Sequence, residues 1–263
     1  MCGIFGIYNF NDVKVREDKL KKYTLSLQHR GPDALGVWSY KNVGLGHTRL
    51  SIIDLSKRAN QPFITVDGKY VLAYNGEIYN YKSLKTQLKT PYEYRTDSDT
   101  ELLINGLAIE KENFINKIEG MFSFSFYDKN SNEMLIARDS FGIKPLYYHY
   151  NEDRLIFSSE IKTLLLDNSV KVEVDYDALK EVFLLGYNMD PNTCFKNIHR
   201  LRPGHFMKIN RDGIKIEEYW SVFELLNNNT NVDWLDIFDE SIRMHCLSDV
   251  SIGSLLSGGI DSN

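Results

Sequence analysis

Cys2 is the first residue of the chain whose type and position could do covalent chemistry. Removal of Met1 would place a thiol and a free α-amine on this one residue. Because an α-amino group titrates at about 7.7 to 8.0, it could accept the thiol proton near neutral pH and return it to a leaving amine. The alternative is a small apolar residue in a buried strand. Cys2 is therefore a candidate N-terminal nucleophile that carries its own base.

Cys2 belongs to the first of a series of short motifs along the chain. The motifs are Met1–Gly6, His29–Asp33, His47–Ile52, Tyr74–Asn80 and Arg138–Tyr148. Together they resemble the glutaminase domain of class II glutamine amidotransferases over about residues 2–210. The resemblance implies an α+β fold, the αββα sandwich of N-terminal nucleophile hydrolases. It also implies hydrolysis of glutamine through a thioester on Cys2, with release of ammonia and no need for a cofactor.

The Asn75-Gly76 pair lies in one of these motifs. By residue type alone the pair is typical of a tight turn, since Asn and Gly tolerate positive φ. The resemblance instead implies an oxyanion hole made by the side-chain amide of Asn75 and the backbone N–H of Gly76. Each such donor stabilises a developing tetrahedral oxygen by about 3 kcal/mol in acyl-transfer enzymes. We therefore expect Cys2, Asn75 and Gly76 to be the catalytic residues.

Arg49 and Asp99 are candidates for binding the two charged groups of a free amino acid. A planar guanidinium suits bidentate capture of a carboxylate, and the alternative for Arg49 is an ion pair on a strand surface. Asp99 stands in the first turn of a predicted helix, where the helix dipole favours a carboxylate whatever its function. The resemblance implies that Arg49 binds the α-carboxylate of glutamine and Asp99 its α-ammonium. It assigns the rest of the glutamine pocket to Leu50, Ser51, Ile52, Ile53, Asn75, Gly76 and Glu77, and a closing lid to residues 29–33.

The last residues predict a second kind of site. Residues 250–256 are expected to form a strand that leads into a Ser-Gly-Gly-Ile-Asp-Ser loop. This loop resembles the pyrophosphate-binding loop of ATP pyrophosphatase domains, although Gly-Gly between serines is by itself more often a tight turn. After a glutaminase domain, it resembles the loop of glutamine-hydrolysing asparagine synthetases. The resemblance implies nucleotide binding by Leu256, Ser257, Gly258, Gly259, Asp261 and Ser262.

The same resemblance implies that a full-length enzyme uses ATP and Mg²⁺ to convert aspartate and glutamine into asparagine, glutamate, AMP and pyrophosphate. We expect a glutaminase domain over residues 2–210, a polar connector over 211–233, and over 234–263 the truncated start of an α/β adenine nucleotide α-hydrolase-like domain. This chain alone is then expected to hydrolyse glutamine without making asparagine. Two alternatives stay open: a related amidotransferase with another acceptor, such as a polysaccharide, and an inactive fragment.

Composition and charge exclude several classes of binding partner. The formal net charge is −5 and no dense run of Lys and Arg occurs, which argues against nucleic acid. No stretch approaches the roughly 18 apolar residues of a membrane span, and the N-terminus does not resemble a signal peptide. We expect a cytoplasmic protein that binds glutamine, aspartate and ATP, with a homodimer left open. The three distant cysteines and the scattered histidines lack metal-ligand spacing, so no metal site is expected in this chain.

Hydrophobic periodicity predicts a β-rich scaffold with helices packed outside antiparallel sheets. Ser98 and Glu101 have the spacing of a capping box and predict the start of a helix. Other helices are predicted at 160–166, 176–185 and 234–247, and one more around residues 20–27. Strands are predicted at 2–8, 36–40, 43–53, 70–74, 122–126, 133–137 and 154–157.

Overall fold

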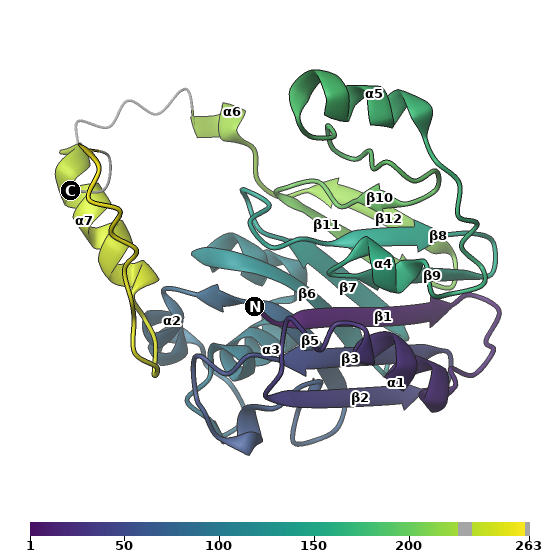
Figure 1. Cartoon of the computed structure of the whole chain (residues 1–263). Coiled ribbons are helices and arrows are strands. Elements are labelled where there is room, and N and C mark those ends of the chain that lie inside the picture. Colours follow the sequence, from purple (N-terminus) through teal and green to yellow (C-terminus); the bar gives the residue numbers. More distant parts are fainter. Residues whose placement is uncertain (226–232, 261–263) are drawn as a thin grey trace.

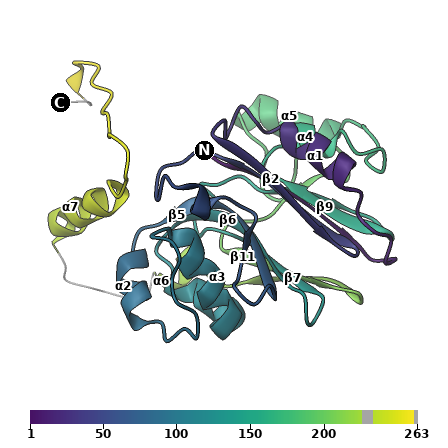
Figure 2. The same ribbon diagram turned by 90° about the horizontal axis from the view of Figure 1, so that it is seen from below.

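The computed structural model describes residues 1–225 and 233–260, and within these ranges a pair of six-stranded antiparallel sheets face each other (Figures 1 and 2). The first sheet has the order β10 (His199–Arg200), β8 (Tyr147–Tyr150), β9 (Arg154–Ser158), β1 (Gly3–Asn9), β3 (Val43–Arg49), β2 (Ala34–Tyr40). The second has the order β12 (Gly213–Glu218), β11 (His205–Asn210), β7 (Glu133–Arg138), β6 (Gly120–Asp128), β5 (Tyr70–Ile78), β4 (Phe63–Ile64).

Helices cover the outer faces of both sheets (Figure 2), which confirms the predicted αββα sandwich. Helices α1 (Glu17–Leu25) and α4 (Ile161–Leu164) pack on the first sheet, and α2 (Tyr81–Gln87), α3 (Asp99–Glu110) and the 3₁₀ helix η2 (Lys111–Lys117) lie beside the second. The remaining helices are η1 (Lys57–Ala59), α5 (Tyr176–Leu185), α6 (Val222–Leu225) and α7 (Trp234–His245). No helix in the described ranges is both long and apolar enough to cross a membrane.

Alternation along the strands decides which side chains enter the layer between the sheets. On β1, Ile4 and Tyr8 pack in that layer, whereas Phe5 and Ile7 pack under the helices of the first sheet. Cys2 precedes Ile4 by two residues. The same alternation therefore directs its side chain to the end of the layer between the sheets.

Two predicted strand boundaries were wrong near the site. The strand predicted to reach Ile53 ends at Arg49, because the guanidinium of Arg49 donates to the carbonyls of Ile53 and Ser56 and so holds the following segment as a loop. The strand predicted to end at Tyr74 continues to Ile78. Asn75 and Gly76 are thus inside β5, not in a tight turn.

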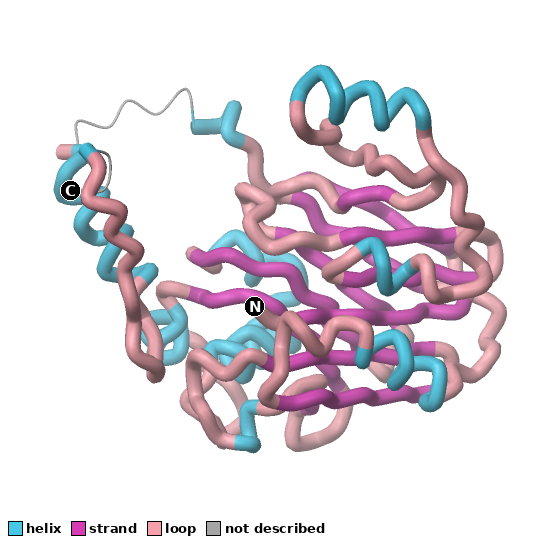
Figure 3. Tube along the Cα trace, in the orientation of Figure 1, coloured by secondary structure: helices cyan, strands magenta, loops and turns pink. Residues whose placement is uncertain are grey.

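The C-terminal segment also differs from its prediction. Helix α7 forms as expected, but residues 250–256 form no strand and are exposed (Figure 3). The segment contacts the sandwich through the His245 ring, 4.2 Å from the ring centre of Tyr79, and through Asp249, whose carboxylate accepts from the N–H of Asp54 at 2.7 Å. Residues 226–232 of the predicted connector lie outside the described residues.

Candidate active site

A cavity of about 240 Å³ opens at the end of the layer between the sheets. A larger cavity, of about 430 Å³, lies over β7, β11 and β12 and contains none of the predicted site residues. Among the predicted residues, Ser51 does not line the smaller cavity, and its N–H donates to the carboxylate of Asp33 at 2.8 Å. The predicted residues that do line it are Cys2, Arg49, Leu50, Ile52, Ile53, Asn75, Gly76, Glu77 and Asp99.

Cys2 brings a thiol to this cavity. The backbone N–H of Leu50 donates to its Sγ at 3.4 Å, and the thiol donates to the carbonyl of Leu50 at 3.6 Å. Burial raises the pKa of Cys2 above its ordinary value, although the contact with Leu50 and the nearby terminal amine oppose this effect. The resting thiol is therefore protonated and needs a base before it can attack.

Met1, which carries the terminal amine, lines the same cavity. Burial lowers the pKa of this amine below the ordinary value, and the positive charges of Arg30 and Lys144 add to this effect. A lowered pKa increases the fraction of unprotonated amine at neutral pH.

Asn75 offers an unused hydrogen-bond donor. Its side chain is 1% exposed, and its Nδ2 has no partner within the described residues. Leaving a buried donor unpaired costs about 1–3 kcal/mol, so such a group in a cavity points to a ligand that would accept from it.

Gly76 offers a second donor by virtue of its place in β5. The N–H of Tyr74 donates to Oε1 of Gln61 at 2.6 Å, and the N–H of Ile78 donates to Oδ2 of Asp99 at 3.0 Å. Since every second N–H points to the same edge of a strand, the N–H of Gly76 lies on this edge, between Gln61 and Asp99. A Cβ at Gly76 would be 2.4 Å from the carbonyl oxygen of Met121 on β6, so the close approach of the two strands requires glycine.

Asp99 begins α3 and is held from three sides. Its Oδ2 accepts from the hydroxyl of Tyr74 at 2.8 Å and from the N–H of Ile78, and its Oδ1 accepts from the hydroxyl of Ser98 at 3.3 Å. Burial raises the pKa of Asp99, and these hydrogen bonds oppose the rise. Ser98 caps the helix as predicted, but Glu101 accepts from the N–H groups of Arg95 and Thr96, so the reciprocal half of the capping box is not made.

Arg49 reaches the cavity from the end of β3 and is 5% exposed. Its Nη1 donates to the carbonyl of Ser56 and to Oδ1 of Asn60, both at 2.8 Å, and its Nη2 donates to the carbonyls of Ile53 and Asp54. These contacts support the loop that forms one wall of the cavity. A carboxylate that bound both Nη groups would have to replace some of them.

Comparison of the sequence with known protein families identifies the kind of domain that contains this cavity. Residues 1–220 match the sequence model described as a glutamine amidotransferase domain. This chain belongs to the glutamine amidotransferase family. Residues 233–263 of the amidotransferase chain match a second model, described as asparagine synthase.

Curated relatives of this amidotransferase chain include two bacterial enzymes. It is 37% identical over 273 residues to asparagine synthetase [glutamine-hydrolyzing] 1 of Bacillus subtilis, covering 100% of this chain and 43% of the relative. It is 33% identical over 274 residues to asparagine synthetase B [glutamine-hydrolyzing] of Escherichia coli, covering 100% of this chain and 44% of the relative. The chain thus spans less than half the length of these relatives.

The fold also resembles that of a solved amidotransferase. Glutamine phosphoribosylpyrophosphate amidotransferase of B. subtilis superimposes with a TM-score of 0.59 at 22% identity, covering 83% of this chain and 49% of that chain. This likeness supports the fold of the amidotransferase chain.

Some residues that line the cavity were not predicted from the sequence. Lys144 is 6% exposed and lines the cavity, and burial lowers its pKa while Glu77 opposes this effect. Lys144 belongs to the Arg138–Tyr148 motif, but no role was predicted for it from the sequence. Gln61 was missed because it stands in a loop without a motif, yet it lines the cavity and donates from Nε2 to the hydroxyl of Thr100 at 3.4 Å.

The predicted nucleotide-binding loop lies apart from this cavity. Leu256, Ser257, Gly258 and Gly259 are exposed, and Leu256 is 69% exposed. The N–H of Gly259 donates to the hydroxyl of Ser257 at 3.3 Å, and Gly258 has a φ of 75°. Asp261 and Ser262 lie outside the described residues.

Proposed function

We propose that this amidotransferase chain hydrolyses glutamine at Cys2. The observation that carries the proposal is the convergence of three groups on one cavity: Sγ of Cys2, the unpaired Nδ2 of Asn75, and Gly76, whose N–H points to the same strand edge as those of Tyr74 and Ile78. Membership of the glutamine amidotransferase family supports the same substrate.

The proposed reaction has two halves. After removal of Met1, the α-amine of Cys2 takes the thiol proton, and the thiolate attacks the side-chain amide carbon of glutamine. Asn75 and Gly76 donate to the tetrahedral oxygen while the α-ammonium gives its proton to the leaving nitrogen, which departs as ammonia. In the second half the α-amine takes a proton from water, the resulting hydroxide attacks the γ-glutamyl thioester, and glutamate and the thiol are released.

Binding of glutamine is proposed to use Asp99 and Arg49, which line the same cavity and carry opposite charges for the two groups on the α-carbon. Asp99 would accept from the α-ammonium, and Arg49 would donate to the α-carboxylate after its Nη groups exchange partners in the loop. Leu50, Ile52, Ile53 and Glu77 would complete the pocket. Ser51 is left out of this set because it does not line the cavity.

For a full-length protein we propose the reaction of the asparagine synthetases named above, with aspartate as the ammonia acceptor. That reaction would use ATP and Mg²⁺, and the resemblance assigns the nucleotide to the loop that contains Ser257–Gly259. The described residues of this loop are exposed, which does not fit a closed nucleotide site, so we derive no step through ATP or Mg²⁺. The domain limits at residues 210 and 233, a cytoplasmic location and a homodimer stay predictions.

The test is a glutaminase assay on purified protein whose N-terminus has been verified by mass spectrometry. We expect glutamate and ammonia to form in equal amounts, and Cys2→Ala to abolish both. Cys246→Ala is the matched control, because Cys246 is an exposed thiol outside the cavity, and it should keep full activity. Absence of turnover in folded protein with Cys2 at its N-terminus would refute the proposal. Other ammonia acceptors share this glutaminase step, so the assay does not depend on the acceptor.

A further inference from the structure

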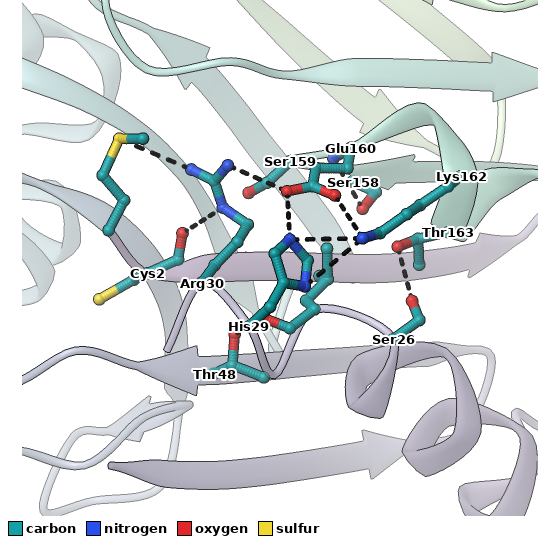
Figure 4. A network of polar contacts seen from close by, with 12 residues as sticks. Cys2, Ser26, His29, Arg30, Thr48, Ser158, Ser159, Glu160, Lys162 and Thr163 are labelled. Carbon is teal, nitrogen blue, oxygen red and sulfur yellow. Dashed lines mark hydrogen bonds and ion pairs between the residues drawn. The ribbon is translucent and has the colours of Figure 1, made fainter. Parts of the chain in front are cut away.

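A network of charged side chains reaches the backbone of Cys2 from the corner between β9 and α4 (Figure 4). The Nε of Arg30 donates to the carbonyl oxygen of Cys2 at 2.8 Å, and its Nη1 donates to Oε1 of Glu160 at 3.2 Å. The same carboxylate oxygen lies 2.8 Å from Nε2 of His29, and Oε2 of Glu160 lies 3.1 Å from Nζ of Lys162. Glu160 therefore joins residues that are about 130 positions apart in the sequence.

The network extends the hydrogen bonds by which β9 holds β1. Phe5 pairs with Ser158 as the last ladder position. Beyond it, the N–H of Ile4 donates to the hydroxyl of Ser159 at 3.0 Å, and the N–H of Ser159 donates to the carbonyl of Ile4 at 3.0 Å. Glu160, the next residue, acts on Cys2 through Arg30. Consecutive residues of one segment thus fix the start of β1 up to the proposed nucleophile.

Burial and charge make the Arg30–Glu160 contact more than a surface ion pair. The side chains are 9% and 23% exposed, so water screens this pair less than the outer contacts of Lys162, which is 54% exposed. Burial alone would raise the pKa of Glu160, but hydrogen bonds from His29, Lys162 and Arg30 outweigh it and lower the pKa below its ordinary value. Glu160 is therefore an anion at neutral pH.

The carbonyl of Cys2 becomes more important once Met1 has been removed. A residue at the N-terminus has no preceding peptide to restrict its rotation, so its carbonyl is the backbone group that remains to orient it. Rotation about the Cα–C bond of Cys2 would move both the thiol and the α-amine relative to Asn75 and Gly76. A hydrogen bond that fixes the carbonyl also fixes the direction of attack.

We infer that Glu160 is a positioning residue for glutamine hydrolysis, because its carboxylate holds Arg30 on the carbonyl of Cys2 and thereby aligns the thiol and the α-amine. This inference rests on the proposed function. Glu160 lies outside the cavity that would bind glutamine. Its role should therefore appear in the chemical rate and not in substrate affinity.

The first experiment compares Glu160→Gln with the unmodified protein. The change keeps the shape and removes the charge, so we expect kcat for glutamine hydrolysis to fall about tenfold with KM within about twofold. Glu173→Gln is the matched control, because Glu173 pairs with Lys196 at 2.6 Å on the surface, and it should leave both constants unchanged. Thermal unfolding monitors folding of each variant. Labelling of Cys2 by a glutamine-like diazoketone, which needs attack but no turnover, should slow in parallel with kcat.

A second variant tests the route through Arg30. Arg30→Lys retains a positive charge but cannot contact both the Cys2 carbonyl and Glu160 with a rigid fork. In this background Glu160→Gln should change kcat by less than about twofold, because the connection is already broken. An unchanged kcat in folded Glu160→Gln, a tenfold loss in the Arg30→Lys background, or a loss confined to KM would overturn the inference while leaving the proposed function intact. Unmodified protein inert to both glutamine and the diazoketone would overturn both.

Discussion

At the residue scale, the unpaired side-chain amide of Asn75 predicts that a substitution there changes kcat much more than KM. Asn75→Ala removes a donor that the proposed mechanism uses at the tetrahedral oxygen, so we expect kcat to fall by about 10²-fold with a much smaller change in KM. Steady-state glutaminase kinetics measure this split.

The control for Asn75→Ala is Asn105→Ala. Asn105 is 2% exposed and its Nδ2 also has no partner among the described residues, but it lies on α3 and outside the cavity. Its loss should leave kcat unchanged. Equal losses of kcat in the two variants would show that Asn75 acts only through packing.

Asp99 predicts a pH dependence of glutamine binding. Burial raises the pKa of Asp99, so this carboxyl becomes protonated at a higher pH than an exposed aspartate would. Only the carboxylate pairs with an ammonium group, and therefore KM for glutamine should rise as pH falls through the raised pKa. In Asp99→Asn, KM should be high and almost independent of pH over the same range. A KM that stays flat with pH in the unmodified protein would remove Asp99 from the binding site.

At the scale of elements, His47 connects the two sheets next to the proposed oxyanion residues Asn75 and Gly76. It stands on β3, and its Nε2 lies 2.9 Å from the carbonyl oxygen of Tyr74, the residue before Asn75 on β5. Burial lowers the pKa of His47 from 6.5 to about 3. The unfolded chain therefore binds a proton that the folded chain does not between these pH values, and stability falls as pH falls from 6.5 toward 3.

We expect His47→Gln to remove part of this acid sensitivity, because glutamine cannot take up the proton in the unfolded state. Urea unfolding of both proteins at about pH 7 and about pH 5, on either side of the ordinary histidine pKa, measures the difference. A larger loss of stability on acidification in His47→Gln than in the unmodified protein would contradict the assignment.

Gly76 tests the contact between β5 and β6. A Cβ at this position would be 2.4 Å from the carbonyl oxygen of Met121, so Gly76→Ala must push the strands apart. We expect a loss of about 1–3 kcal/mol of stability and of most glutaminase activity. Gly253→Ala is the control, since nothing lies within 4 Å of its added Cβ, and it should unfold and react as the unmodified protein does. A neutral Gly76→Ala would refute the tight approach.

Some strands could be predicted from the sequence, and others could not because they depend on contacts with distant residues. The alternation of Phe122, Phe124 and Phe126 predicted β6 because each phenylalanine faces the same helix-covered side. By residue type alone the Asn75-Gly76 pair is typical of a turn, but it lies inside β5, since local residue preference contains no information about Gln61 and Asp99, which bind the edge of that strand. Residues 250–256 have the composition of a strand, but a strand needs a partner, and none pairs with them among the residues that the structure describes.

At the scale of the whole molecule, the predicted sandwich is confirmed, whereas the roles of the site residues stay predictions. Cys2 and Asn75 stand in motifs of the resemblance, Asp99 stands in the predicted capping box, and all three line one cavity. Glu160 could not be found in this way, because its contact with Arg30 depends on how β9 and α4 meet the start of β1. The positions of Gln61 and Lys144 likewise follow from long-range packing.

The central claim is that a free α-amine on Cys2 activates its own thiol. The most direct measurement compares glutamate formation by two mass-verified forms of the protein, one beginning at Cys2 and one retaining residues before it through an N-terminal extension. We predict turnover and a γ-glutamyl adduct on Cys2 in the first form, and a folded but inactive second form. Equal turnover by both forms, or an adduct on another residue, would contradict the account.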